Sequence, residues 1–162
     1  MIHAELIIRN VLESYGDGGF FSDAGTIDVE WSSDDETLWD SFGAAVRAAR
    51  RGIVEEAVYV LRGGLDDSGN EPDQHTVVGA QAALDEVAVE RAILALPLSE
   101  IIAAHRAGVA AFTEVMEEDP ICFYDDRYSG SRAVRACREA SRQYIDNALD
   151  ARGGIMNFGG LV

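Results

Sequence analysis

The stretch Gln74–Leu96 reads QHTVVGAQAALDEVAVERAILAL, and it decides the fold class of this chain. Its apolar residues lie around much of the circumference of a helix instead of along one stripe, which is typical of a helix at the centre of a fold. Asp73 or Thr76 is the expected N-cap, and Pro97 ends the helix. The apolar residues are Val77, Val78, Leu84, Val87, Val89, Ile93 and Leu94. We therefore expect a helical core built around this segment.

Apolar residues spaced three and four apart predict further helices on both sides of this segment. They cover Ala4–Tyr15, a helix that starts at the capping box Ser33–Glu36, Ser99–Met116 and Ser131–Arg152. The residues expected to be buried after the capping box are Leu38, Trp39, Phe42, Val46 and Ala49.

Two segments between these helices are less regular. Gly52 is expected to kink or end the helix that follows the capping box. Ile53–Leu61 has the composition of a strand and the spacing of a helix, and the helix stop Arg62-Gly63-Gly64 favours the helix.

Strict alternation predicts a strand at Thr26–Trp31, paired with Phe20–Phe21 through a turn near Asp23–Gly25. Ile121–Tyr124 is a second candidate strand. The fold class predicted is α+β and predominantly helical, with about five helices and a small antiparallel sheet or hairpin. We expect a single domain over residues 1–162 that ends in a charge-free tail, residues 153–162.

The charge of the chain is strongly unbalanced. Its 162 residues carry 29 acidic side chains against 13 basic ones, a net charge of −16, and all 13 basic residues are arginine. Residues 127–162 reverse the sign, with six arginines against three acids. Solubility with arginine-rich coding, adaptation to a salty cytoplasm, and a cationic partner each explain an acidic body. Of the three, the cationic partner makes a specific prediction.

The sequence also excludes several classes of protein. No charge-free run is longer than the 11 residues Gln74–Leu84, whereas a membrane span needs roughly 20 apolar residues. The N-terminal residues lack a cationic region and carry Glu5 and Arg9, so we expect no signal peptide and a cytoplasmic location. Free nucleic acid is an unfavourable partner, because its phosphates would meet a negative surface.

Candidates for catalysis or metal binding are weak in this sequence. His105 is expected to face the core, because it shares a helical stripe with Ile101, Val109, Phe112 and Met116. Glu86 and Glu90 stand one turn apart, but no Glu-x-x-His pair accompanies them, so a solvated edge is favoured over a metal site. The loop Asp66–Glu71 does not fit an EF-hand and is expected to be a solvated acidic loop. We therefore predict no cofactor, no metal and no catalytic residue.

The last predicted helix carries a stripe of guanidinium groups at steps of three, three and four. The stripe consists of Arg132, Arg135, Arg138 and Arg142. The opposite, buried face is expected to hold Val134, Cys137, Ser141, Tyr144, Ile145 and Ala148. Guanidinium groups bind carboxylates and phosphates alike, and the abundance of acids favours pairing with carboxylates of the same chain or of a second copy.

The function predicted is that of an acidic, non-enzymatic binding protein that inhibits a basic nucleic-acid-handling partner. Viral anti-defence proteins, anti-CRISPR proteins among them, and the immunity proteins of nuclease toxins are analogues in charge and size alone, and the former would act inside a virus-infected host cell. The predicted partner-binding residues are Asp28, Glu30, Asp34, Asp35, Glu36 and Asp40. The alternatives are a self-assembling structural protein, in which the acidic body meets the arginine stripe of another copy, and a small metal-dependent enzyme.

Overall fold

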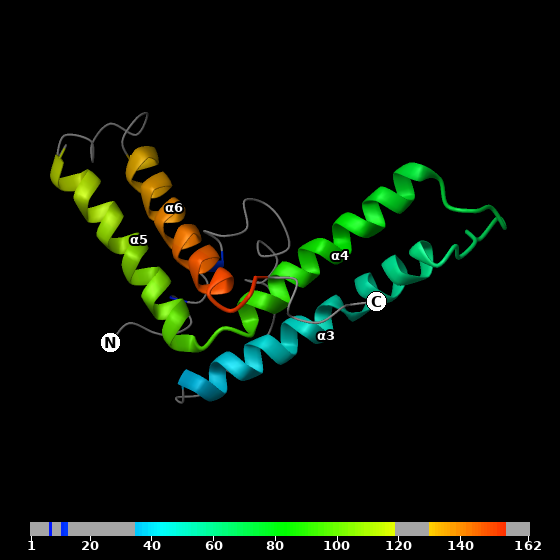
Figure 1. Ribbon diagram of the computed structural model, residues 1–162, viewed down its shortest axis with the longest axis horizontal. Coiled ribbons are helices and arrows are strands. Elements are labelled where there is room, and N and C mark those ends of the chain that lie inside the picture. Colours follow the sequence, from blue (N-terminus) through cyan, green and yellow to red (C-terminus); the bar gives the residue numbers. More distant parts are fainter. Residues whose placement is uncertain (1–6, 8–10, 13–34, 119–129, 155–162) are drawn as a thin grey trace. The chain divides into compact units, whose positions relative to one another are not determined.

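The computed structural model describes residues 7, 11, 12, 35–118 and 130–154 of the chain (Figure 1). These residues contain the helices α3 (Asp35–Leu61), α4 (Gln74–Leu94), α5 (Leu98–Glu118) and α6 (Gly130–Asp150). The chain divides into two compact units. One unit comprises Met1–Gly25 and Leu96–Arg152, and the other comprises Thr26–Ala95 and Gly153–Val162. The single domain over residues 1–162 stays a prediction.

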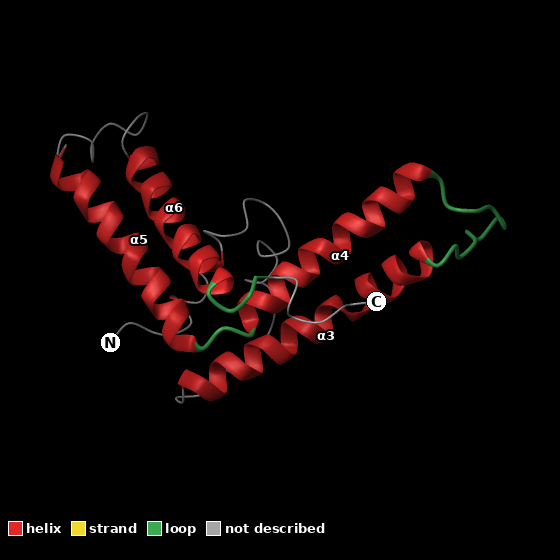
Figure 2. Ribbon diagram, in the orientation of Figure 1, coloured by secondary structure: helices red, strands yellow, loops and turns green. Residues whose placement is uncertain are grey.

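The predicted α+β class is wrong, because the described residues form four helices with turns and loops and include no strand (Figure 2). Val58-Tyr59-Val60-Leu61 has the composition of a strand but lies inside α3. There the spacing of its apolar residues, which pack toward α4, outweighs β propensity. The segments predicted as strands, Phe20–Phe21, Thr26–Trp31 and Ile121–Tyr124, lie outside the described residues.

The number of helices also differs from the prediction, with four described instead of about five. Of the predicted helix Ala4–Tyr15, the structure describes Ile7, Val11 and Leu12, which are helical and buried. The helical preference at Ile53–Leu61 is confirmed, and α3 continues through Gly52 without ending there. A Cβ atom at Gly52 would meet nothing within 4 Å, so this glycine occupies an open position on the helix.

Helices α3 and α4 form an antiparallel hairpin, and Figure 1 shows them side by side. The half of this hairpin next to the loop between α3 and α4 has a buried centre, which is formed by Ala57, Ala80 and Leu84. Partly buried side chains pack around that centre, namely Val54, Val58, Val60 and Leu61.

The other half of the hairpin, where α3 begins, contains larger buried side chains. One predicted core position is wrong there. Trp39 and Phe42 are buried and stack with ring centroids 6.2 Å apart. Ala49 was expected to be buried but is exposed, and Arg50 is buried in its place. The next buried residue after Val46 is therefore Arg50, four positions later. In the sequence, an arginine at that position indicates a surface residue, so its burial was not predicted.

Arg50 is buried because it pairs with Glu90 of α4. The Nε atom of Arg50 lies 3.3 Å from both carboxylate oxygens of Glu90, whose side chain is 1% exposed. Burial raises the pKa of Glu90, and the charge of Arg50 opposes that rise. The predicted solvated edge at Glu86–Glu90 is thus wrong for Glu90, whereas Glu86 is exposed. The reason is a partner 40 residues away in the chain, which no local pattern reveals.

In the other unit, α5 and α6 pack together most closely at Gly108. A Cβ atom on Gly108 would collide with Ser141 Oγ and would lie 3.0 Å from the carbonyl oxygen of Cys137. The hydroxyl of buried Ser141 donates a hydrogen bond of 3.0 Å to the carbonyl oxygen of Ala104. A glycine and a serine thus let the backbones of α5 and α6 approach, and the hydroxyl is satisfied within the contact.

Polar contacts join the two ends of the α5–α6 pair. At one end Glu100 accepts hydrogen bonds from the Tyr144 hydroxyl at 2.9 Å and from Arg152 Nη2 at 3.0 Å. The Arg152 guanidinium and the Tyr144 hydroxyl hold the pKa of Glu100 below its ordinary value. At the other end Arg132 lies 3.2 Å from Glu118. These contacts fix the register of the two helices.

Three valines that the apolar patterns assigned to buried or core-facing positions are exposed instead. Val78 of α4 is 59% exposed, and Val109 of α5 and Val134 of α6 are also exposed. The apolar pattern of one helix does not show how far its neighbours extend over it.

We expect Gly108→Ala to lower the free energy of unfolding by about 1–3 kcal/mol, because the added methyl group overpacks the contact with Ser141 and Cys137. Gly79→Ala on α4 is the matched control, since a Cβ atom there meets nothing within 4 Å. The control should raise stability by up to about 1 kcal/mol through helix propensity. Denaturant unfolding measures both, and equal effects of the two variants would contradict the close approach.

We also expect Glu90→Ala to lower the free energy of unfolding by about 3–5 kcal/mol, because it leaves the charge of Arg50 buried without its partner. The double variant Arg50→Met, Glu90→Leu should recover most of that loss, since it removes both charges together. A double-mutant cycle in denaturant unfolding measures the coupling, and additive losses would contradict the buried pair.

Candidate interaction surfaces

The end of the α3–α4 hairpin, residues 59–76, is the first candidate surface. Helix α3 closes there with the two hydrogen bonds of a Schellman motif. The backbone N–H of Gly64 donates to the carbonyl of Tyr59 at 2.9 Å, and that of Gly63 donates to the carbonyl of Val60 at 3.0 Å. Gly63 has a φ of +79°, which a residue with a side chain rarely adopts. The helix stop seen in the sequence therefore acts through this glycine.

Tyr59 holds the first residues of the loop against the helix. Its ring packs on Gly64, where a Cβ atom would collide with the ring carbons. Its hydroxyl donates a hydrogen bond of 2.9 Å to the carbonyl of Leu65. The ring is nevertheless 56% exposed, and Leu65 beside it is 48% exposed. The hairpin end thus offers two apolar side chains to a partner, and the ring of Tyr59 is anchored in the free protein.

Asp66 organises the middle of the loop. Its carboxylate accepts hydrogen bonds of 2.8 Å from the backbone N–H groups of Ser68 and Asn70, and one of 3.2 Å from the Asn70 side chain. Gly69, with a φ of +81°, lets the loop turn back so that Asp66 and Asn70 also bond through their backbones. The hydrogen bonds from Asn70, followed by that from Ser68, hold the pKa of Asp66 below its ordinary value of 3.8.

Asp73 begins the returning helix. Its carboxylate accepts hydrogen bonds of 2.7 Å from the hydroxyl and from the backbone N–H of Thr76, so Asp73 is the N-cap of α4. The same two bonds, the hydroxyl first, hold the pKa of Asp73 below 3.8. Of the two candidate caps in the sequence, Asp73 is confirmed and Thr76 supplies the donors.

The hairpin end carries four carboxylates that form no ion pair with the described residues. Four carboxylates, those of Asp66, Asp67, Glu71 and Asp73, fall within eight residues, and all four are exposed. The ion pairs of Arg50, Arg132 and Arg152 involve none of these four acids. Asp66 and Asp73 use their charge to fold the loop, whereas Asp67 and Glu71 make no such bond. The predicted solvated acidic loop is therefore confirmed.

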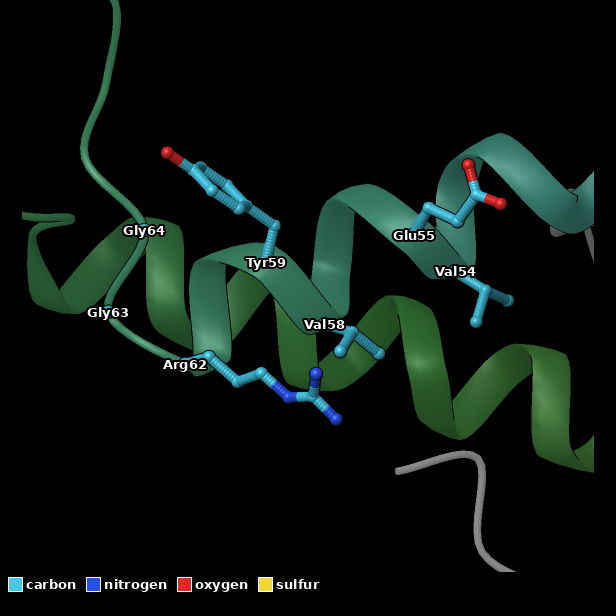
Figure 3. Close-up of a pocket in the computed structure, with 7 residues that line it drawn as sticks. All are labelled: Val54, Glu55, Val58, Tyr59, Arg62, Gly63 and Gly64. Carbon is cyan, nitrogen blue, oxygen red and sulfur yellow. The ribbon is translucent and has the colours of Figure 1, made fainter.

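A groove lies beside the last turns of α3, with a volume of about 460 Å³ (Figure 3). In Figure 3, Tyr59 and Glu55 project from one side of the helix and Val58 from the other. Its lining consists of Val54, Glu55, Val58, Tyr59, Arg62, Gly63 and Gly64. The groove thus combines an apolar wall with a carboxylate, a phenol and the guanidinium of Arg62.

The arginine stripe of α6 is the second candidate surface. Arg132 is exposed and pairs with Glu118, as expected for pairing within the chain. Arg135 and Arg138 are also exposed, and they line an open groove of about 360 Å³ along α6. The other residues of that groove are Glu139, Arg142, Gln143 and Asp146. The opposite face is confirmed at Ser141, Ile145 and Ala148, which are buried.

The structure describes only some of the predicted partner-binding carboxylates. Asp28, Glu30 and Asp34 lie outside the described residues. Asp35 and Glu36 occupy the first turn of α3, and Asp40, one turn further along, is exposed. The six residues therefore stay a prediction, and the hairpin end is an acidic surface that the sequence analysis did not assign to a partner.

Among the residues that the structure describes, the candidates for chemistry do not assemble into a reactive group. His105 is half-buried, and loss of solvent lowers its pKa. The thiol of Cys137 is half-buried and unpaired, and burial raises its pKa, so it is not an activated nucleophile. Among the described residues, no three His, Cys, Asp or Glu side chains come together as a metal site would require. None of the described helices has the length and hydropathy to cross a membrane.

No protein-family model, curated protein or solved structure matches this chain. The two surfaces must therefore be interpreted from their own residues.

We expect the hairpin end to keep its fold well into the acid range. Because the pKa values of Asp66 and Asp73 are lower in the folded chain than in the unfolded one, their contribution to stability is present above the ordinary value of 3.8. It is lost only as the pH falls through the lowered values. An NMR titration of the carboxyl carbons of Asp66 and Asp73 measures this. Midpoints for these two residues at or above the ordinary value of 3.8 would contradict the loop structure.

Proposed function

We propose that this protein is a non-enzymatic binding protein that uses its acidic surface to occupy the nucleic-acid site of a basic partner. The observation that carries the proposal is the hairpin end, where four exposed carboxylates lack ion pairs and stand beside exposed Tyr59 and Leu65. Carboxylates spaced over a surface attract a groove evolved for phosphates. An apolar side chain among them supplies the desolvated anchor that charge alone does not provide.

The order of the loop supports this role. The Schellman motif, the Tyr59 hydroxyl, the Asp66 turn and the Asp73 cap hold the loop in one conformation before any partner binds. A surface ordered in advance loses less conformational entropy on binding than a flexible loop of the same composition. Such an ordered acidic end is better suited to recognition than to solubility alone.

The charge of the hairpin supports it as well. Residues 35–95 carry 12 acids and five arginines, and one of those arginines, Arg50, is buried against Glu90. A basic partner would therefore be steered toward this hairpin over long range, with an association rate that falls as salt rises. Asp35 and Asp40 lie near the start of α3, at the opposite end of that helix from the hairpin end, so the sequence-based set from Asp28 to Asp40 is a separate proposed surface.

A pull-down with the purified protein, at low and at high salt, tests the proposal on nuclease-treated extract. Asp67→Arg combined with Glu71→Arg should reduce retention of nucleic-acid-binding proteins roughly tenfold at low salt, because it reverses the two carboxylates that do not fold the loop. Added double-stranded DNA should displace the retained protein, since both occupy one site.

The matched control is Glu114→Arg combined with Glu117→Arg, which changes the net charge equally on α5, where both residues are exposed. It should retain the partner. Reversal of Asp35, Glu36 and Asp40 tests the sequence-based site in the same assay. If no nucleic-acid-binding protein is retained at either salt, or if the hairpin variant and the control behave alike, the proposal is wrong.

A further inference from the structure

Two arginines that line the groove along α6 form no ion pair with the described residues. Arg135 and Arg138 lie three residues apart, so they occupy the same side of the helix. Both are exposed, and no ion pair within the described residues involves either of them. Arg132, on the same helix, pairs instead with Glu118 of α5. Two guanidinium groups are thus left to bind an acid from elsewhere.

The groove is mixed in charge, and this favours a protein over a nucleic acid as its occupant. Glu139 and Asp146 line it together with the arginines, and Gln143 adds an amide. A phosphate backbone, with one negative charge at every step, would meet these two carboxylates along the groove. A loop with separate carboxylates and backbone carbonyls can place its acids on the arginines and its neutral groups on the rest.

The chain itself contains a loop of that kind. The hairpin end offers Asp67 and Glu71, exposed and without an ion pair, on a loop whose fold does not depend on their charges. Guanidinium forks bind carboxylates through paired hydrogen bonds, so the two surfaces are complementary in chemistry as well as in charge.

We propose that the Arg135–Arg138 groove of α6 binds the hairpin end of a second copy of this chain, through Asp67 and Glu71. The contact joins two different surfaces, so it gives a reciprocal two-fold dimer, a closed ring or an open chain. It also covers the acidic surface assigned above to a basic partner, so self-association and partner binding compete. The inference does not depend on that function, because it concerns only copies of this chain.

Two charge-reversed variants test the contact by analytical ultracentrifugation at low salt. Variant A is Arg135→Glu with Arg138→Glu, and variant B is Asp67→Arg with Glu71→Arg. In A alone two acidic surfaces meet, and in B alone two basic surfaces meet, so each should dissociate at a concentration at least about tenfold higher than the natural chain. In an equimolar mixture the acidic groove of A meets the basic hairpin end of B, and the natural groove of B meets the natural hairpin end of A.

The mixture should therefore regain the assembly that each variant loses alone, and rising salt should weaken it. Glu114→Arg with Glu117→Arg should assemble like the natural chain. Circular dichroism checks that every variant keeps its helical content. A natural chain that stays monomeric at low salt over the whole concentration range overturns the proposal. So does a mixture of A and B that stays monomeric while the natural chain assembles, because the contact would then involve other surfaces.

Discussion

The hydrogen bonds that Asp66 and Asp73 accept are the constraint on which the hairpin end depends. Each carboxylate satisfies backbone N–H groups in the turn between α3 and α4, and each has its pKa lowered by doing so. They turn a polar loop of low apolar content into an ordered one. Because Asp66 and Asp73 form the hydrogen bonds that order the loop, Asp67 and Glu71 have no structural role there and can contact a partner.

The acids of this protein thus have two different tasks, and net charge alone does not separate them. Glu90 is buried against Arg50, and Glu100 ties Tyr144 and Arg152 together. These contacts stabilise each pair of helices. An acid without such a contact attracts a basic partner electrostatically over long range. A partner would then be selected by the acids that the fold does not use.

The same division applies to the arginines, and it links the two proposals. Arg50 and Arg152 complete contacts within their own units, whereas Arg135 and Arg138 do not. If unused arginines of one copy bind unused acids of the next, assembly would hide the acidic hairpin end until a stronger basic partner takes it. Salt would weaken both contacts, since both are electrostatic and exposed.

The sequence by itself determined the helical segments, since spacing of apolar residues, the stop at Arg62-Gly63-Gly64 and the cap at Asp73 are local signals. It also determined the excess of acid and the arginine stripe of α6. Only the tertiary structure decided that Arg50 and Glu90 are buried and Ala49 is not, because the partners are 40 residues apart. In the same way it decided that Gly108 must be a glycine, because the groups a side chain would strike belong to another helix. Which charges remain for a partner depends on such distant contacts, and a local pattern carries no information about them.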